Sequence, residues 1–185
     1  MMGSMNRTLK EMIILSMCAA VLFVQQLALS FIPNIQLSVL LVVLYTRVFG
    51  FRKTSAIIII HVLVTNILSP FGPVIPVYIP AMVIAWMLVP VLLSTVFRHV
   101  RSALGLAVFG LFYGFVYGWV YIPFAVFFTG APFEAYVLMD IPFEILMAIS
   151  NFTTILWLYD PLHRMLNRQI HLHLHTPIIG SVMDR

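Results

Sequence analysis

The sequence has few charged residues and almost no cysteine. Charged side chains make up 9% of the 185 residues, whereas hydrophobic side chains make up 62%. A water-soluble domain carries about 25% charged residues, because its surface faces water. The charges of this chain are too few for such a surface, and we expect lipid to cover it instead. The single cysteine, Cys18, excludes a disulfide within the chain and a metal site built on cysteine.

The sequence also lacks the motifs that mark several classes of enzyme and channel. A GxxxxGK[ST] nucleotide-binding loop, an HExxH zinc motif and a GxSxG nucleophile turn are all missing. Rows of arginine such as those of a voltage sensor are absent, and no inverted transporter repeat is evident. We therefore expect no enzyme activity, no cofactor of its own and no metal site. Any ATP hydrolysis would take place in partner subunits.

Hydrophobic runs fill most of the sequence, and prolines lie at most of their ends. About 20 apolar residues in a helix cross a hydrocarbon core of about 30 Å. We predict an all-α membrane protein with six transmembrane helices, over residues 12–31, 35–48, 54–68, 77–97, 103–128 and 135–159. The second and third runs are short for full spans. Pro33 and Pro161 are expected to end the first and the sixth helix.

The positive charges are sorted between alternate connections. The ten Lys and Arg residues fall in the N-terminus, in residues 47–53, in residues 98–101 and in the C-terminal region. Because Lys and Arg stay on the cytoplasmic side, we expect both termini in the cytoplasm and all six helices in the cell membrane. This topology accounts for the net charge of +4 without nucleic-acid binding.

The same topology divides the chain into three parts. We predict a cytoplasmic N-terminus at residues 1–11, a six-helix membrane domain at residues 12–162 and a cytoplasmic tail at residues 163–185. Residues 1–5, MMGSM, resemble the remnant of an expression tag and are left out of the fold argument.

Ionisable side chains in the sixth run are the clearest functional signal. A buried charge in a span costs at least a few kcal/mol, so such residues point to function by default. Asp140, Glu144 and Asn151 lie four and seven residues apart, and therefore share one helical face. Glu144 precedes Tyr159 by fifteen residues, which places it roughly 22 Å from the inner end of the helix. A structural explanation accounts for the two carboxylates equally well. In it, Asp140 lies at the outer interface and Glu144 is paired within the bundle.

Other polar and aromatic side chains also fall toward the outer side. Amides, carboxylates and aromatic rings are typical of small-molecule sites. We predict an outward-facing pocket formed by Asn34, Gln36, Asn66, Tyr78, Trp86, Tyr121, Asp140, Glu144 and Asn151. An aromatic belt at the membrane interface explains Tyr78 and Tyr121 as well, and core packing explains Trp86.

Small residues indicate two close helix contacts. Ser16 and Ala20, with Ala19 beside them, form a small-xxx-small step, and residues 110–118 contain a GxxxGxxxG pattern. The glycines suit packing inside the bundle or against another subunit. In the tail, QIHLHLH at residues 169–175 alternates histidine with apolar residues, which suits a strand better than a helical metal site.

Three stretches of sequence carry a family resemblance. They are FIPNIQLSVLLVVLYTRVFGFRKTSAIIIIHVLVTNIL at residues 31–68, YIPAMVIAWMLVPVLL at residues 78–93 and DIPFEILMAISNFTTILWLYDPL at residues 140–162. In these stretches the chain resembles the substrate-binding S components of energy-coupling factor (ECF) transporters. Those are small six-helix proteins of the bacterial plasma membrane with both termini in the cytoplasm, and the resemblance implies the same location for this chain. The resemblance is distributed, and no single motif in it is diagnostic.

The resemblance implies a function, partners and site residues. An S component binds a vitamin at its outer side and joins a membrane scaffold subunit and two cytoplasmic ATPase subunits, whose ATP hydrolysis drives release inside the cell. The ligand site of the family carries over to Asn34, Gln36, Asn66, Asp140, Glu144 and Asn151. The scaffold contact carries over to Ser16, Ala19 and Ala20, where Ser16 departs from the AxxxA-like pattern of the family.

The substrate follows less directly from the sequence. The PNIQLSVLL stretch looks closest to the cobalamin branch of the family, and the proline-rich connection near residues 70–76 suits a wide outer opening. The alternatives are an S component for another vitamin or precursor, such as pantothenate, folate or a queuosine precursor. A membrane assembly protein that packs by its glycines is a further alternative, as is an intramembrane enzyme with Asp140 and Glu144 as an acid–base pair.

Overall fold

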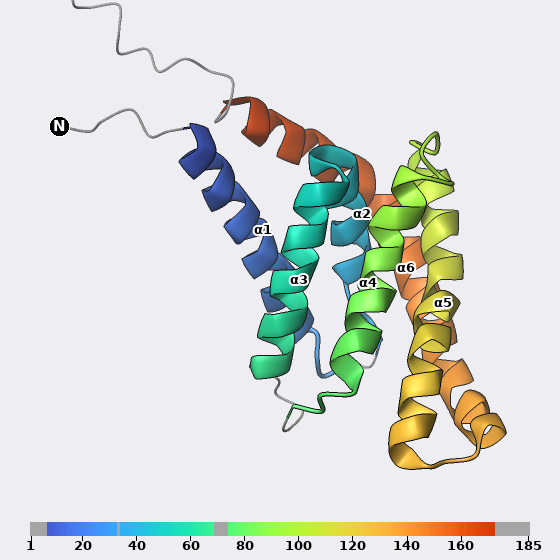
Figure 1. Cartoon of the computed structure of the whole chain (residues 1–185). Helices are drawn as coiled ribbons and strands as arrows, with labels where there is room; N and C mark the ends of the chain where they lie inside the picture. Colours follow the sequence, from blue (N-terminus) through green and yellow to red (C-terminus); the bar gives the residue numbers. More distant parts are fainter. Residues whose placement is uncertain (1–6, 33, 69–73, 173–185) are drawn as a thin grey trace, which may run out of the picture.

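The computed structural model describes residues 7–32, 34–68 and 74–172, and over these residues the chain folds into six α-helices without a β-strand (Figure 1). The helices are α1 (Arg7–Ala28), α2 (Ser38–Phe49), α3 (Phe51–Ile67), α4 (Tyr78–Ser94), α5 (Ala103–Thr129) and α6 (Phe133–Ile170). The prediction of an all-α chain with six helices is confirmed for this part of the sequence.

Helix α2 is the centre of the bundle. It contacts each of the other five helices, and residues 38–46 are all buried. A helix that meets protein on every side need not reach both surfaces of a bilayer. This position explains why α2 is only 12 residues long, which corresponds to about 18 Å of helix.

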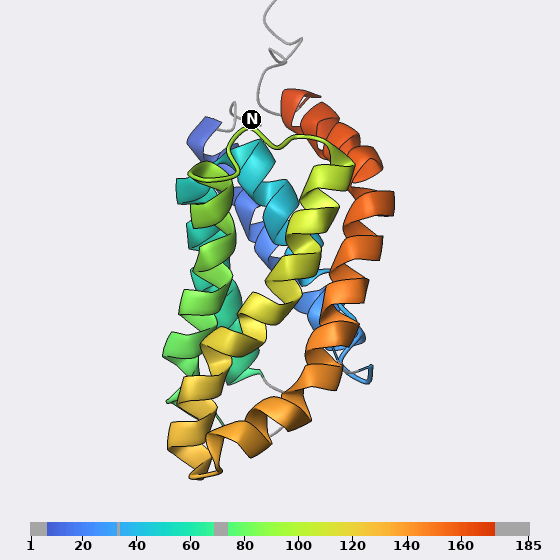
Figure 2. The same ribbon diagram turned by 90° about the vertical axis from the view of Figure 1, so that its right-hand side faces the viewer.

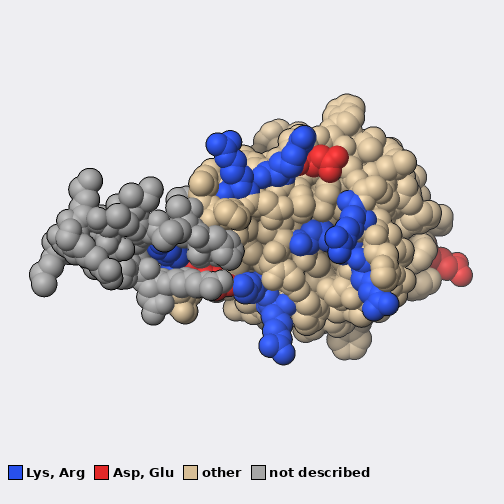
Figure 3. All heavy atoms as spheres, turned by 90° about the horizontal axis from the view of Figure 1, so that it is seen from above, with Lys and Arg blue, Asp and Glu red and all other residues tan. Residues whose placement is uncertain are grey.

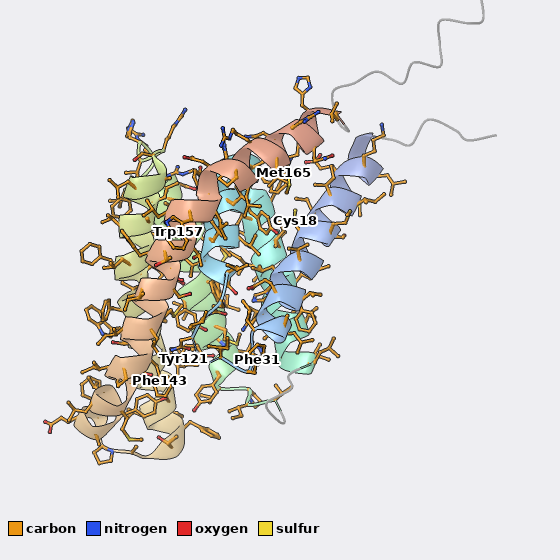
Figure 4. The ribbon with its side chains drawn as sticks, turned by 180° about the vertical axis from the view of Figure 1, so that it is seen from behind. Cys18, Phe31, Tyr121, Phe143, Trp157 and Met165 are labelled. Atoms are coloured by element: carbon orange, nitrogen blue, oxygen red, sulfur yellow. The ribbon has the colours of Figure 1, made fainter. Side chains whose placement is uncertain are left out.

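The remaining helices surround α2 in the order α1, α3, α4, α5, α6, with a contact between each successive pair. Helices α1 and α6 make no contact of this kind and meet only through α2. An apolar groove of about 380 Å³ lies between them, lined by side chains of α1, α2 and the C-terminal part of α6. Cys18 and Met165, labelled in Figure 4, line it from α1 and α6.

Two glycines with positive φ end helices. Gly50 has φ of 78°, and its N–H donates to the carbonyl of Thr46 at 3.1 Å. Because glycine adopts this conformation without steric cost, the chain reverses direction in one residue and α3 begins at Phe51, earlier than predicted. Gly130, with φ of 69° and ψ of 10°, ends α5 in the left-handed helical conformation.

Helix α6 is longer than the sequence predicted. It runs for 38 residues to Ile170, with Pro142 and Pro161 inside it, so the prediction that Pro161 ends the sixth helix is wrong. A proline removes one helical N–H and kinks a helix without having to end it. Figure 2 shows α6 changing direction twice along its length. Residues 163–170 of the predicted tail therefore belong to α6, whereas His173, His175 and residues 1–5 lie outside the described residues.

Three helices are long and apolar enough to cross a membrane. They are residues 8–28 of α1, the whole of α5 and the whole of α6. Helices α2 and α4 are shorter apolar helices. Large apolar side chains are exposed around the outside of the bundle, among them Val24, Ile60, Phe112 and Ile149. Exposed apolar surface of this extent marks contact with a membrane or another protein.

Lys and Arg side chains gather at one end of the bundle (Figure 3). That end contains the start of α1, the turn between α2 and α3, the connection between α4 and α5, and the end of α6 (Figure 1). Lys53 forms an ion pair with Glu11 there. The opposite end, with the connections α1–α2, α3–α4 and α5–α6, has no Lys or Arg among its described residues.

Arg47 holds the charged end together. Its guanidinium donates hydrogen bonds to the carbonyls of Leu93 at 3.2 Å, Phe97 at 2.8 Å, Arg98 at 3.4 Å and Val100 at 2.7 Å. These carbonyls belong to the end of α4 and the connection that follows it, where helical partners run out. One side chain from the central helix therefore fixes the path between α4 and α5.

Candidate functional site

Helices α5 and α6 build the floor of the candidate site by packing closely. A Cβ on Gly114 would lie 2.6 Å from both the backbone N and the Cα of Ala148, so only glycine permits this approach. One turn further along α5, a Cβ on Gly118 would overlap the Glu144 carboxylate and lie 2.9 Å from Asp140 Oδ2. The GxxxGxxxG pattern therefore packs inside the bundle, and both carboxylates converge over Gly118.

The two carboxylates differ in their surroundings. Glu144 is 5% exposed, and its Oε1 atom is buried without a hydrogen-bond partner. Asp140 lies one turn earlier in α6 and is half-buried. Pro142 lies between them and removes an N–H from this stretch of α6. A buried carboxylate oxygen without a donor is costly, so a hydrogen-bond donor or a positive group brought to this part of α6 would stabilise it.

Tyrosines surround the carboxylates. The rings of Tyr117 and Tyr121 stack with centroids 5.5 Å apart, and Tyr78 continues the row at 5.5 Å from Tyr121. Tyr136 precedes Asp140 by one turn of α6 and lines the same cavity. Each tyrosine presents a ring face and one hydroxyl, so the walls of the site are aromatic with polar edges.

The connection between α1 and α2 closes the site from another side. Asn34 has a positive φ of 57°, and its Nδ2 donates to the carbonyl of Phe143 at 2.9 Å. Gln25 fixes the rest of this connection, because its Oε1 accepts from the Leu37 N–H at 2.9 Å and its Nε2 donates to Ser38 Oγ at 2.6 Å. Phe31, Tyr121 and Phe143, labelled in Figure 4, all lie toward this end of the bundle.

Two cavities adjoin at this place. The acidic cavity, as we call it, has a volume of about 120 Å³ and is lined by Asn34, Tyr117, Gly118, Tyr121, Tyr136, Asp140 and Glu144, among others. The amide cavity has a volume of about 290 Å³ and is lined by residues that include Gln26, Ser30, Asn34, Gln36 and Tyr117. Asn34 and Tyr117 line both cavities, so the two are neighbours.

Five of the predicted site residues line these two cavities. They are Asn34, Gln36, Tyr121, Asp140 and Glu144. The expected face of α6 is only partly open, because α5 covers its other end. Asn151 lies there, fully buried, with its Nδ2 donating to the carbonyl of Gly110 at 3.1 Å.

Three further predicted residues, Asn66, Trp86 and Tyr78, line neither cavity. Asn66 turns to α4 and its own helix, donating to Met82 Sδ at 3.2 Å and to the carbonyl of Val62 at 2.8 Å. Trp86 is buried, with its ring centroid 5.3 Å from that of Tyr117. Tyr78 contacts the site through the Tyr121 ring. Trp86 and Tyr78 thus support the walls from behind, through the rings of Tyr117 and Tyr121.

Tyr136 is one of the lining residues that the predicted site did not include. It precedes Asp140 by four residues, as Asp140 precedes Glu144, so all three share one helical face. The spacing of four residues could therefore have predicted Tyr136 as part of the site. Gly118 was read only as a helix contact, and nothing in the sequence indicated that the carboxylates of α6 would lie above it.

The residues predicted to contact a partner do not share one surface. Ser16 and Ala20 are exposed on α1, whereas Ala19 is 5% exposed and belongs to the core. Ser16 and Ala20 therefore form a small exposed step on α1 that does not include Ala19. Its use as a scaffold contact stays a prediction.

The described residues contain no group of three or more His, Cys, Asp or Glu side chains that could hold a metal ion. The chemistry available in the acidic cavity is thus that of two carboxylates, tyrosine hydroxyls and aromatic faces. Such a set binds hydrogen-bond donors and positive charge. No family model, no curated protein and no solved structure matches this chain.

Proposed function

We propose that the chain is a multi-pass membrane protein and the substrate-binding S component of an ECF-type importer. It captures a vitamin at the end that carries the two cavities and delivers it inward when coupled to a scaffold subunit and ATPase subunits. The observation that carries the proposal is the polarity of the bundle. Cations gather at one end, and a partly enclosed polar cavity with one buried and one half-buried carboxylate lies at the other.

The membrane location is supported by the outside of the bundle. Helices α1, α5 and α6 have the length and composition of spans, and their outward side chains include Val24, Phe112 and Ile149. With the cationic end in the cytoplasm, as the distribution of Lys and Arg favours, both cavities face the exterior. A ligand arriving from outside then meets the site first.

A carrier is favoured over an enzyme. Asp140 and Glu144 lie together as an acid–base pair would, but the acidic cavity offers no Ser, Cys, Lys or His among its lining residues to act as a nucleophile. A Glu144→Gln variant should lose ligand affinity if the residue binds cargo. If the variant binds and transports normally, Glu144 has no part in either role.

The glycine pattern weighs against an assembly protein that packs by its glycines. Gly110, Gly114 and Gly118 are covered by α6, so they are not available to a second subunit. The exposed step at Ser16 and Ala20 is a much smaller surface for such a role.

The resemblance favours cobalamin as the vitamin, with pantothenate, folate or a queuosine precursor as alternatives. The cavities of about 290 and 120 Å³ suit a small ligand, because sites for drug-sized molecules usually measure about 300–1,000 Å³. A corrinoid would require the connections at this end to move apart. Binding of each candidate to the purified chain in detergent separates these possibilities.

The decisive experiment isolates the chain from its native membrane under mild detergent. Mass spectrometry then identifies both the proteins and any small molecule that remain bound. Recovery of a membrane scaffold subunit with an ATPase pair supports the proposal. Recovery of the chain without such partners, together with no binding to the vitamin panel, refutes it.

A further inference from the structure

Among the described residues, no positive charge balances the two carboxylates of the acidic cavity. Every Lys and Arg side chain that the structure describes lies at the opposite end of the bundle. Pro33 and residues 69–73, which the structure does not describe, contain no Lys or Arg in the sequence. The described side chains of the cavity lining that can donate to Asp140 and Glu144 are the tyrosine hydroxyls and the amide of Asn34, one of whose two N–H groups donates to the Phe143 carbonyl.

The burial of Glu144, in addition to its pairing with Asp140, indicates a binding site. The side chain is 5% exposed, lines the cavity, and leaves Oε1 without a hydrogen-bond partner. A buried carboxylate is retained in proteins when a partner compensates it. The close approach of α5 at Gly118 holds Oε1 beside Asp140 Oδ2, so one positive group in the cavity can interact with both.

The walls indicate which kind of cation fits. Tyr117, Tyr121 and Tyr136 line a volume of about 120 Å³, and aromatic faces attract organic cations such as ammonium and pyridinium groups. A metal ion is less well suited, because the described chain offers no third His, Cys, Asp or Glu ligand. The adjoining amide cavity, with Gln26, Gln36 and Ser30, suits a neutral part of the same molecule.

We infer that the acidic cavity binds the positively charged nitrogen group of a small organic cation, with Asp140 and Glu144 as its counter-charges and the tyrosines around it. This inference rests on the proposed function only in taking the cavity for the cargo site. It narrows the cargo to molecules with an ammonium, amidinium or nitrogen-heterocycle cation and a neutral hydrogen-bonding remainder.

The test uses pairs of probes that differ mainly in charge. The full chain is reconstituted in nanodiscs, and dissociation constants are measured by calorimetry for 1-methylnicotinamide against nicotinamide and for benzylamine against benzyl alcohol. We expect each cation to bind at least tenfold more tightly than its neutral partner. Equal affinity within both pairs, or no binding of either cation, overturns the inference.

Matched variants assign the preference to the two carboxylates. Glu144→Gln and Asp140→Asn each should weaken binding of the cations at least tenfold and leave binding of the neutral probes unchanged. Glu134→Gln removes the same charge from the exposed start of α6 and should change neither. Should Glu144→Gln fail to fold, Asp140→Asn and the probe pairs on the unaltered chain still decide the outcome.

The two proposals fail separately. A neutral or anionic cargo retained with a scaffold subunit and an ATPase pair would overturn the cation inference and support the transporter. A cation preference that depends on Asp140 and Glu144, in a chain that isolates without such partners, would support the inference and refute the transporter.

Discussion

The Nη2 atom of Arg47 donates a hydrogen bond to the carbonyl oxygen of Phe97 at 2.8 Å, across 50 residues of sequence. The contact joins the last turn of the central helix to the connection that follows α4. Arg47 was noted in the sequence only as one of the cations that set the topology. In the fold it also replaces the backbone donors that the end of α4 lacks.

Replacing Arg47 should therefore destabilise the bundle. We expect Arg47→Ala to lower the free energy of unfolding by about 2–3 kcal/mol, because charge-assisted hydrogen bonds to several carbonyls are lost. Arg47→Lys should recover only part of this loss, since an ammonium cannot reproduce the guanidinium fork. Thermal unfolding in detergent measures both. Arg52→Ala, at an exposed position, is the control and should cost less than about 0.5 kcal/mol; equal losses at both positions would contradict the role of Arg47.

Gly114→Ala should also destabilise the protein, although alanine is the better helix former. The new Cβ would lie 2.6 Å from the backbone of Ala148, and overpacking of this kind costs about 1–3 kcal/mol. Gly105→Ala makes the same chemical change in the same helix, but its closest contact is the Val100 side chain at 2.6 Å, which can rotate away. We expect the Gly114 variant to unfold at a clearly lower temperature than the Gly105 variant. The reverse order would show that α5 and α6 are not fixed by this contact.

Gln25 should control the order of the connection between α1 and α2. Gln25→Ala removes the acceptor of the Leu37 N–H and the donor to Ser38, so amide exchange at Leu37 should accelerate. Gln26→Ala is the neighbouring control, because Gln26 Oε1 makes no hydrogen bond in the described structure. Hydrogen–deuterium exchange read by mass spectrometry compares the two variants. Equal protection of Leu37 in both would argue against this network.

Cysteine labelling checks the direction of the bundle in the membrane. In a Cys18→Ala background, we expect His99→Cys to react with a membrane-impermeant maleimide only after the cells are opened. Thr129→Cys should react in intact cells, because it lies at the end of the bundle that carries the two cavities. Labelling of His99→Cys in intact cells would show that the topology is the opposite one, with the two cavities on the cytoplasmic side.

The helices were largely predictable because each one contains a long, mostly apolar run. Their ends were less so, because local signals there compete with packing. Pro161 predicted the end of the sixth helix, but α6 bends and continues to Ile170. Residues 49–53 read as a connection, yet Gly50 alone reverses the chain and leaves Phe51 and Arg52 in the first turn of α3.

The candidate site was predictable only as far as one helix dictates it. The spacing of Asp140 and Glu144 placed both on one face of α6, and they do line one cavity. Asn151 follows the same spacing but is buried, because α5 covers that stretch at Gly110. Which part of a polar face stays open depends on the neighbouring helix, and a single sequence does not reveal which helix that is.

The absence of a helix-to-helix contact between α1 and α6 leaves the wall around α2 unclosed. The groove there is almost entirely apolar, so in a bilayer the acyl chains of lipids would complete the packing that protein omits. The stability of the bundle along this seam would then depend on the thickness and chain length of the host membrane. The polypeptide alone would not determine it.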